Sequence, residues 1–418
     1  MAETPDILLR QLFDRAVEVA DPMQVIPNVL PPKPEAGRVV VIGAGKASAR
    51  MAEAVESVWG PCDGLVITRY GYARPCAGIE IVEAAHPVPD DAGIAATGRL
   101  LEIVSGLGPD DFALALISGG GSALLCAPAE GLTLADKQAV TSDLLASGAP
   151  IGEINGIRKQ LSSVKGGKLA AAAFPARMLT LMISDVPGDD PGDIASGPTV
   201  GDDGDADRAI AALRTWDITP PDAVAAFLAG GGQSVPPGDP RLANVENRII
   251  SAPSQSLAAA ADLARDAGCD VRILGDAIEG EARDVARDHA ALALERQSQM
   301  SPQAKHMVLL SGGELTVTRR GDGIGGPNAE YALALAVALD GAPGVFALAC
   351  DTDGVDGAAE VAGAIIGPDT LSRGPDATEA LARNDAHGYF GRIGDQVVPG
   401  PTLTNVNDFR AILIQPPN

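Results

Sequence analysis

The sequence is poor in cations, histidines and aromatic residues. Among 418 residues, 31 are Lys or Arg against 55 Asp or Glu, which gives a net charge of −24. This surplus of acid opposes non-specific binding to nucleic acid or to an anionic membrane. The five cysteines show no C-x-x-C pair and no metal-ligand spacing: Cys62, Cys76, Cys126, Cys269 and Cys350. We therefore expect reduced thiols, no nucleic-acid partner, and anion binding only by a few placed cations.

Long apolar runs are also absent. No segment has the uninterrupted apolar length that a membrane-spanning helix needs. The N-terminus, "MAETPDILLRQLFDRAVEVADP", has acidic residues and an amphipathic period instead of a basic region followed by a long apolar run. It predicts a surface helix and not a signal peptide. We expect a cytoplasmic protein with no membrane partner.

What the sequence does have is an alternation of short aliphatic strands and amphipathic helices. Only 3% of the residues are aromatic, so the core must be built from aliphatic side chains, which suits layered sheets and helices. "RVVVIGAGKASARMAEAVESV" predicts a strand, a turn and a helix, and the same pattern leads to the buried strand "DFALALIS". Such alternation predicts a mostly parallel sheet with helices on both faces.

A second alternating series begins at "NRIISAPSQSLAAAADLARDAGCDVRILG". It follows "AGGGQSVPPGDP", residues 229–240, whose Gly, Ser and Pro content predicts an interdomain linker. The predicted fold class is α/β, with two three-layer α/β/α domains at residues 1–235 and 236–418. We expect ligands in an interdomain cleft at the carboxyl ends of the strands.

Three consecutive glycines stand between a strand and a helix-like segment in "LISGGGSALL". Glycine lets a ligand approach the backbone closely and permits positive φ. A strand that leads through such a turn into a helix presents free N–H groups, which bind anions. A tight turn without a ligand has the same sequence, so both interpretations stay open. The residues of the predicted anion cradle are Ser118, Gly119, Gly120, Gly121 and Ser122.

A lysine follows the first predicted strand in "GAGKAS". The stretch imitates a dinucleotide-binding fingerprint, but Ser48 stands where the third Gly or Ala is expected, and the P-loop pattern is absent. A lysine at a helix start is unfavourable with respect to the helix dipole unless an anion lies between them. This favours a functional Lys46 over a solvated one.

Cations are concentrated in "NGIRKQLSSVKGGKLA". At helical spacing Arg158, Ser162 and Lys165 would share one face, with Lys159 and Lys168 nearby. Such a cluster could hold a phosphate or carboxylate. A solvated basic helix end is the alternative.

Two acidic, Gly-rich turns follow predicted strands. "SDVPGDDPGDIASGPT" contains Asp185 and Asp189, and "DTDGVDG" contains Asp351, Asp353 and Asp356. Carboxylates at strand ends either bind a hard cation such as Mg²⁺ or act as general bases. Ordinary turn chemistry is the alternative. Glycine loops, cations and carboxylates together are the parts of a phosphoryl-transfer site.

A series of motifs gives the chain a family resemblance. They are "VIGAGKAS", "HPVPD", "SGGGSALL", "IRKQLSSVKGGKLA", "SDVPGDDPGDIASGPT", "SGGELTV", "GGPNAEYALALA", "DTDGVDG" and "TNVNDF". In this order the chain resembles the type II glycerate kinases, from about Leu9 to Leu413. The resemblance implies a Rossmann-like N-terminal domain and a C-terminal MOFRL region at about residues 305–414. It also implies a kinase that uses ATP and Mg²⁺ to convert D-glycerate into 2-phosphoglycerate, with a homodimer left open.

The resemblance also assigns roles to residues. The family's lysine after the first strand is Lys46, and its "SDV-x-GD" aspartates are Asp185 and Asp189. "GGPNAEY" has Pro and Ala where relatives often carry Arg and Gln, so another cation must substitute, for which Arg158 is the candidate. The predicted catalytic residues are Lys46, Arg158, Asp185 and Asp189. Further predicted binding residues are Lys165, Gly312, Gly313, Glu314 and Asn328, and the metal candidates are Asp351, Asp353 and Asp356.

Two other functions are considered. Many relatives are labelled hydroxypyruvate reductases, but an NAD(P)H-dependent reductase would need a convincing nicotinamide loop and a proton donor such as His. The defective fingerprint and only four histidines disfavour it. A non-catalytic binding protein would leave two acidic loops at strand ends unexplained.

Overall fold

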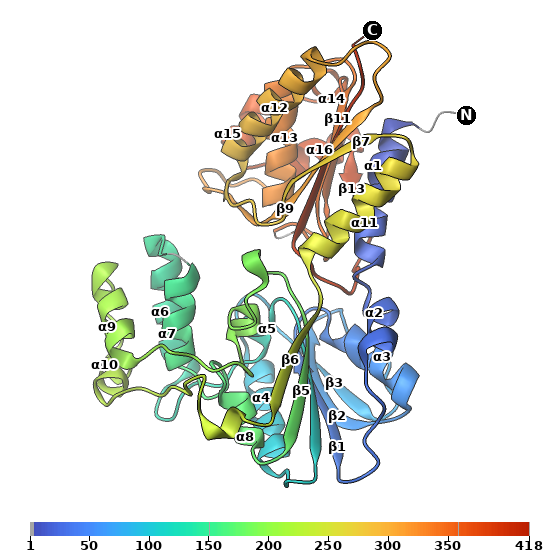
Figure 1. The fold of residues 1–418 in the computed structure, drawn as a ribbon. Helices are drawn as coiled ribbons and strands as arrows, with labels where there is room; N and C mark the ends of the chain where they lie inside the picture. Colours follow the sequence, from blue (N-terminus) through green and yellow to red (C-terminus); the bar gives the residue numbers. More distant parts are fainter. Residues whose placement is uncertain (1–3, 150, 358, 418) are drawn as a thin grey trace. The chain divides into compact units, whose positions relative to one another are not determined.

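The computed structural model describes residues 4–149, 151–357 and 359–417. They form two compact units, each described here by itself (Figure 1). The N-terminal unit comprises the described parts of residues 25–184 and 189–250. The C-terminal unit comprises the described residues up to 24, residues 185–188, and those from 251 onward.

A six-stranded sheet forms the centre of the N-terminal unit (Figure 1). In spatial order its strands are β3 (Ile79–Ala84), β2 (Asp63–Arg69), β1 (Val39–Ala44), β4 (Phe112–Ile117), β5 (Arg177–Ile183) and β6 (Val245–Ser251). From β3 to β5 all neighbours pair in parallel, and Ala44 lies opposite Ile117. The strand order reverses between β1 and β4, so their carboxyl ends form the switch point where open α/β sheets bind ligands.

Both faces of this sheet are buried, as the run of aliphatic residues predicts. Val40 and Ile42 of β1 join a core cluster with α4 (Asp91–Ser105) and α8 (Lys168–Ala173). Val41, which points to the other face, is buried as well, and α3 (Ser48–Trp59) contacts β1, β2 and β4. The prediction of a parallel sheet between helices is confirmed for this unit.

Further helices surround this sheet. They are α2 (Pro22–Val29), α5 (Gly121–Leu124), α6 (Leu134–Ser147), α7 (Ile151–Gln160), α9 (Ala206–Thr215), α10 (Asp222–Ala229) and the 3₁₀ turns η2 (Ile194–Ser196) and η3 (Pro240–Leu242). The 3₁₀ turn η1 (Pro187–Asp189) lies where the chain returns from residues 185–188 of the C-terminal unit. The helices α6, α7, α9 and α10 lie together at one side of the sheet (Figure 1). They share a small core of their own, which includes Val140, Leu144, Ile154 and Ile157.

The C-terminal unit contains a mixed six-stranded sheet. Its strands are, in spatial order, β13 (Gln396–Val397), β12 (Gly363–Ile366), β11 (Val345–Asp351), β14 (Asp408–Ile414), β9 (Met307–Gly313) and β7 (Asp270–Gly275). The last strand, β14, is antiparallel to both β11 and β9, whereas β7 and β9 are parallel. Asp408 therefore lies opposite both Asp351 and Gly313. The ends of β9 and β11 and the start of β14 therefore meet at one end of the sheet.

Helices cover both faces of this sheet. They are α1 (Pro5–Glu18) and α11 (Pro253–Asp266) on one face, and α12 (Ala282–Ser298), α13 (Pro327–Leu339), α15 (Ala377–Ala382) and α16 (Ala386–Ile393) on the other. Alternate residues of β9 serve the two cores: Val308 and Leu310 face α1 and α11, and Leu309 faces α12 and α13. The remaining elements are α14 (Thr370–Arg373) and the short strands β8 (Gly280–Glu281) and β10 (Leu315–Thr316). The predicted three-layer α/β/α architecture is present in this unit too.

The segment predicted as an interdomain linker does not separate the two units. The segment at residues 229–240 lies within the N-terminal unit, because β6, which follows it, is the sixth strand of the first sheet. The predicted N-terminal helix is confirmed as α1, but its apolar face packs on α11, where the Ser256 hydroxyl donates to the Ala16 carbonyl at 2.7 Å. Within the described residues, none of the helices has the length and apolar character needed to cross a bilayer.

Candidate functional site

The Gly-rich turn after β4 packs on the turn after β1. Ser118 Oγ accepts a hydrogen bond from the N–H of Ala47 at 3.0 Å, and the N–H of Lys46 donates to the Gly119 carbonyl at 2.8 Å. A Cβ on Gly45, where φ is +145°, would lie 2.1 Å from Ser118 Oγ. Close packing of two turns is therefore one reason for the glycines here.

The same turn also offers backbone donors. In the described part of the chain, no backbone carbonyl accepts the N–H of Gly119 or Gly120. A Cβ on Gly120, where φ is +75°, would lie 3.1 Å from both Lys46 Cγ and the His86 ring, so these donors lie beside a lysine stem and an imidazole. Unpaired N–H groups beside a cation, at the carboxyl end of a parallel strand, can bind an anion. The sequence left this interpretation open, and the geometry favours it.

Two other turn residues contact neighbouring loops. Gly121 lies against Ala195, because a Cβ there would be 2.6 Å from the Ala195 Cβ. The hydroxyl of Ser122 lies 2.7 Å from that of Ser196. The acidic loop after β5 therefore packs directly on the Gly-rich turn.

Lys165 supports this turn from its buried side. Its Nζ donates to the carbonyl oxygens of Ser122 at 2.8 Å and Leu125 at 3.2 Å. Only 2% of the residue is exposed. Burial, together with the positive charges of Lys137, Arg158 and Lys168, lowers the pKa of Lys165 well below its usual value. Two of the three N–H donors of Lys165, a predicted binding residue, are used by backbone carbonyls, so Lys165 holds the turn.

The expected common face of Arg158, Ser162 and Lys165 does not form, and that prediction was wrong. The helix α7 ends at Gln160, before Ser162. There the Ser162 hydroxyl accepts the N–H of Lys165 at 3.3 Å. Such a side-chain turn replaces the continuing helix.

The other cations of this segment differ in their partners. Lys159 Nζ lies 3.1 Å from Asp202 Oδ1, and Lys168 Nζ donates to the Lys159 carbonyl at 2.6 Å. Burial lowers the pKa of Arg158. No hydrogen bond or ion pair of Arg158 occurs among the residues that the structure describes.

The acidic loop after β5 contains a carboxylate oxygen without a partner. Asp189 has a φ of +55°, which is unfavourable for a residue with a side chain. Its Oδ1 is buried and has no hydrogen-bond partner among the described residues. By contrast, Asp190 Oδ1 accepts the N–H of Gly192 at 2.7 Å. A strained residue with an unsatisfied buried oxygen is a candidate for binding a ligand or cation.

Asp185 belongs to the C-terminal unit, where two asparagines hold it. Asn405 Nδ2 donates to Asp185 Oδ2 at 3.0 Å, and Asn407 Nδ2 donates to the Asp185 carbonyl at 2.8 Å. Both asparagines come from "TNVNDF", directly before β14. This motif is part of the family resemblance, but the sequence predicted no role for its residues. Polar residues directly before a buried strand were the signal that could have found them.

The "DTDGVDG" loop satisfies its carboxylates internally. Asp356, which is 1% exposed, accepts the N–H groups of Asn328 at 2.9 Å and Ala329 at 2.8 Å at the start of α13. His387 Nε2 lies 3.0 Å from the same carboxylate. Asp356 is therefore a helix cap supplied from another segment. Its role as a metal ligand stays a prediction.

The other two carboxylates of this loop also accept backbone donors. Asp351 Oδ1 accepts the N–H of Asp353, and Asp353 Oδ1 accepts that of Val355. Among the residues described, no group of three or more His, Cys, Asp or Glu side chains is arranged to hold a metal ion. That one of Asp351, Asp353 and Asp356 holds a magnesium ion stays a prediction.

The remaining predicted binding residues of the C-terminal unit gather around Asp408. Asn328 Nδ2 donates to Asp408 Oδ1 at 2.6 Å, and the Arg410 guanidinium donates to the Gly312 and Gly313 carbonyls at 2.6 and 3.4 Å. Burial raises the pKa of Asp408. The charge of Glu314 adds to this rise, so Glu314 also lies near this edge of the sheet.

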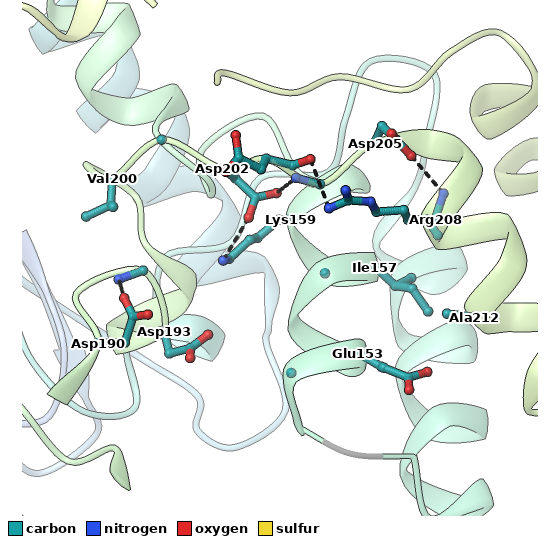
Figure 2. Close-up of a pocket in the computed structure, with 17 residues that line it drawn as sticks. Glu153, Ile157, Lys159, Asp190, Asp193, Val200, Asp202, Asp205, Arg208 and Ala212 are labelled. Carbon is teal, nitrogen blue, oxygen red and sulfur yellow. Dashed lines mark hydrogen bonds and ion pairs between the residues drawn. The ribbon is translucent and has the colours of Figure 1, made fainter. Parts of the chain in front are cut away.

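A groove of about 460 Å³ lies elsewhere in the N-terminal unit, between α7, α9 and the loop at residues 200–205 (Figure 2). Figure 2 shows its cations engaged with neighbouring oxygens: Lys159 points at Asp202, and Arg208 Nη1 donates to the Asp203 carbonyl at 3.4 Å. None of the predicted site residues lines it. Its chemistry is that of a solvated acidic surface.

Comparisons with known proteins cover nearly the whole chain. A family described as "Domain of unknown function (DUF4147)" matches residues 8–229, and the MOFRL family matches residues 307–408. A putative hydroxypyruvate reductase of Agrobacterium vitis is 52% identical over 97% of this chain and 94% of that protein. The D-glycerate 2-kinase of Thermotoga maritima is 38% identical over 95% of each chain, and the glycerate 2-kinase of Pyrococcus horikoshii is 36% identical over 95% and 94%.

The fold agrees with a solved structure. The crystal structure of a glycerate kinase from Thermotoga maritima superposes with a TM-score of 0.85 at 37% identity, over 97% of this chain and 98% of that one. The match extends through both units, and the predicted family resemblance is confirmed. The chain belongs to the type II glycerate kinase family, with a C-terminal MOFRL region.

Proposed function

We propose that this chain is an ATP-dependent kinase that phosphorylates the 2-hydroxyl of D-glycerate, giving 2-phosphoglycerate and ADP. Relatives named glycerate 2-kinases match it along almost its whole length. The observation in this chain that carries the proposal is the anion cradle of the Gly-rich turn. There, the N–H groups of Gly119 and Gly120 lie beside Lys46. Both proposed substrates are small molecules, and the proposed location is the cytoplasm.

In the proposed reaction, the 2-hydroxyl oxygen of glycerate bonds to the γ-phosphorus of ATP as the bond from that phosphorus to ADP breaks. Asp185 accepts the hydroxyl proton, and Asn405 orients its carboxylate through Oδ2. Lys46 and the N–H groups of the Gly-rich turn stabilise negative charge on an anionic substrate group. The proposed roles are thus a base, a cation and oriented dipoles.

A magnesium ion fits one carboxylate better than the others. Asp351, Asp353 and Asp356 already accept backbone N–H groups, as described above. Asp189 Oδ1 is a buried carboxylate oxygen without a partner among the described residues, and it is the donor type that Mg²⁺ takes. We therefore propose Asp189 as the metal ligand from this chain. When bound, the ion would neutralise charge on the phosphates of ATP.

The reductase alternative conflicts with the turn after β1. In dinucleotide-binding folds, the N–H groups at this helix start bind the pyrophosphate. Here the N–H of Ala47 donates to Ser118 Oγ, and the Ser48 hydroxyl donates to the Leu116 carbonyl. The Gly-rich turn therefore occupies the Ala47 donor that a nicotinamide dinucleotide would use.

Product analysis tests the proposed function. The protein is supplied with ATP, Mg²⁺ and D-glycerate, and the product is followed by ³¹P NMR and by coupling to enolase without added mutase. We expect 2-phosphoglycerate. A 3-phospho product would contradict the regiochemistry, and oxidation of NAD(P)H by hydroxypyruvate without phosphorylation would overturn the kinase proposal.

The Lys46→Ala variant tests the cradle in the same assay. Lost charge stabilisation should lower kcat at least about a hundredfold while the protein stays folded. Lys33, whose Nζ donates to the Pro61 carbonyl on the surface, provides the matched Lys33→Ala control. Near-normal turnover of folded Lys46→Ala would remove Lys46 from the mechanism.

A further inference from the structure

The helix α6 carries a lysine whose ammonium is buried without a partner. Lys137 is 8% exposed, and its Nζ has no hydrogen bond among the described residues. It lies one and two turns before Val140 and Leu144, on the face of α6 that shares a core with Ile154 and Ile157 of α7. A buried ammonium without an acceptor is unfavourable, so such a group needs an explanation.

The charged groups around Lys137 are cations. Burial lowers the pKa of Lys137, Cys126 raises it, and the positive charge of Arg158 lowers it. The charges of Lys137, Arg158 and Lys168 in turn help to lower the pKa of Lys165. None of these neighbours is a carboxylate, although Asp202 pairs with Lys159 and raises the pKa of Lys168. The cluster therefore concentrates positive charge inside a chain whose net charge is −24. Like charges gathered in a dry place repel one another unless an anion joins them.

Two of these four cations are already used by the backbone. Lys165 donates to Ser122 and Leu125, and Lys168 donates to Lys159. Within the described chain, neither Lys137 nor Arg158 has such a hydrogen bond. Lys137 and Arg158 are thus the two cations of the cluster that donate no hydrogen bond to the described backbone, and the Lys137 ammonium is buried as well.

The cluster lies next to the Gly-rich turn. Lys165 binds the carbonyl of Ser122, the last residue of that turn. It also binds the carbonyl of Leu125, which directly precedes Cys126. Lys137 interacts electrostatically with both Lys165 and Cys126, so it lies behind the same turn.

We propose that Lys137, with Arg158, binds an oxyanion of a substrate behind the Gly-rich turn. This inference rests on the proposed function, which supplies two sources of that chemistry: a phosphate group of the nucleotide and the carboxylate of glycerate. The bound oxyanion completes the hydrogen bonding of the Lys137 ammonium. Because the Lys137 ammonium is buried, the charge-assisted bond is stronger than one on the surface. Lys137 is thus a binding residue for a group that does not react.

Two variants of Lys137 separate binding from packing. Lys137→Met keeps the length and apolar stem of the side chain and removes the charge, and Lys137→Gln keeps a polar end without charge. The exposed Lys305 provides the matched control Lys305→Met. Melting temperatures and dissociation constants are measured for wild type and each variant, alone and with ADP, D-glycerate or inorganic phosphate.

We expect Lys137→Met to melt at the same or a higher temperature than wild type without ligand, because it removes an unpaired buried charge. At the same time, its dissociation constant for one substrate should rise at least tenfold. The KM of that substrate should rise similarly, with a smaller change in kcat, because the bound group does not react. Loss of ADP binding identifies a nucleotide phosphate, and loss of D-glycerate binding identifies the carboxylate.

Other outcomes overturn the inference. If Lys137→Met and Lys137→Gln bind all three probes as tightly as Lys305→Met does, Lys137 has no ligand. If both variants melt lower and bind normally when folded, its role is structural. These results are distinct from failure of the proposed function. If wild type forms no phosphoglycerate but binds inorganic phosphate in a Lys137-dependent way, the kinase proposal fails and the anion site stands.

Discussion

Two acidic loops of this chain have similar compositions, but their carboxylates differ in whether the protein supplies hydrogen-bond donors to them. In the loop at residues 351–357, both oxygens of Asp356 accept N–H groups from the start of α13. In the loop at residues 184–199, Asp189 keeps a buried oxygen that no described residue contacts by a hydrogen bond. Asp and Gly after a strand predict a turn in both places. The donors that neighbouring elements supply decide whether a carboxylate caps a helix or is left for a ligand.

The largest expected effect in this comparison is that of Asp185→Asn, in the second of these loops. An amide cannot accept the hydroxyl proton, so kcat should fall about a thousandfold, within the range for loss of a general base. The melting temperature should change little, because Asn405 and Asn407 can still contact the side chain and the backbone. Steady-state kinetics with thermal melting measures both.

Asp203→Asn provides the control for Asp185, since it alters an exposed carboxylate in a surface loop. It should keep wild-type kcat. If Asp185→Asn also turns over normally, the loop at residues 184–199 has no catalytic carboxylate at this position, and its contrast with the loop at residues 351–357 loses its main support.

Asp356→Asn should act on stability and not on catalysis. Its amide group would face the N–H of Asn328 or Ala329, donor against donor, inside the protein. Breaking this buried network should lower the free energy of unfolding by about 3 kcal/mol. Denaturant titration of the C-terminal unit's signal measures this, and kcat per folded molecule should stay near wild type. A stable variant that needs more Mg²⁺ would instead restore Asp356 as a metal ligand.

Local signals explain how much of the fold could be predicted. The aliphatic runs that end in glycine predicted β1 and β4 correctly, because such strands and their turns are specified by neighbouring residues. The direction of β14 and the place of β6 were not predictable in the same way. They depend on which sheet edge accepts a strand from far along the chain. The apolar face of α1 predicted a helix, but nothing in it specifies α11 as the partner.

The same distinction applies to the site. The turns that carry Lys46 and residues 118–122 were predicted correctly because a strand end followed by glycine is a local pattern. Their role in binding stays a prediction. The capping role of Asp356 was missed because its donors belong to α13. Asn405 was missed because asparagine is common in turns, and only the fold brings it to Asp185.

Asp189→Asn should raise the Mg²⁺ concentration for half-maximal rate about tenfold, because a neutral amide is a weaker ligand for a hard cation than a carboxylate. The ligand-free protein should be as stable as wild type or more so, since the variant removes an unpaired buried charge. Rates over a Mg²⁺ series and melting temperatures measure the two effects.

Asp190→Asn is the matched control for Asp189→Asn. Asp190 follows Asp189 directly, but its carboxylate is exposed and accepts the N–H of Gly192. Its Mg²⁺ requirement should equal that of wild type. Equal Mg²⁺ requirements for Asp189→Asn and wild type would make Asp189 a turn residue, like the carboxylates of the other loop.

The smallest expected effect tests whether Asp185 is positioned by its neighbour. Asn405→Ala removes the donor that lies 3.0 Å from Asp185 Oδ2, whereas Asn407 still holds the Asp185 carbonyl. The backbone of the loop should therefore stay in place while the carboxylate gains rotational freedom. We expect kcat to fall about threefold to tenfold, the size of an orientation effect and much less than that of removing the base.

The pH dependence of kcat distinguishes positioning from a merely structural role. A hydrogen bond to the charged carboxylate favours its ionised form, so removing the donor raises the pKa that governs the base. The acid limb of the pH–kcat profile of Asn405→Ala should move to higher pH, and at high pH part of the lost rate should return. Asn405→Ser, with a shorter donor, should give a smaller shift. A variant that melts lower but keeps the wild-type profile would show that Asn405 supports the loop alone, and that Asp185, like Asp356, serves the fold.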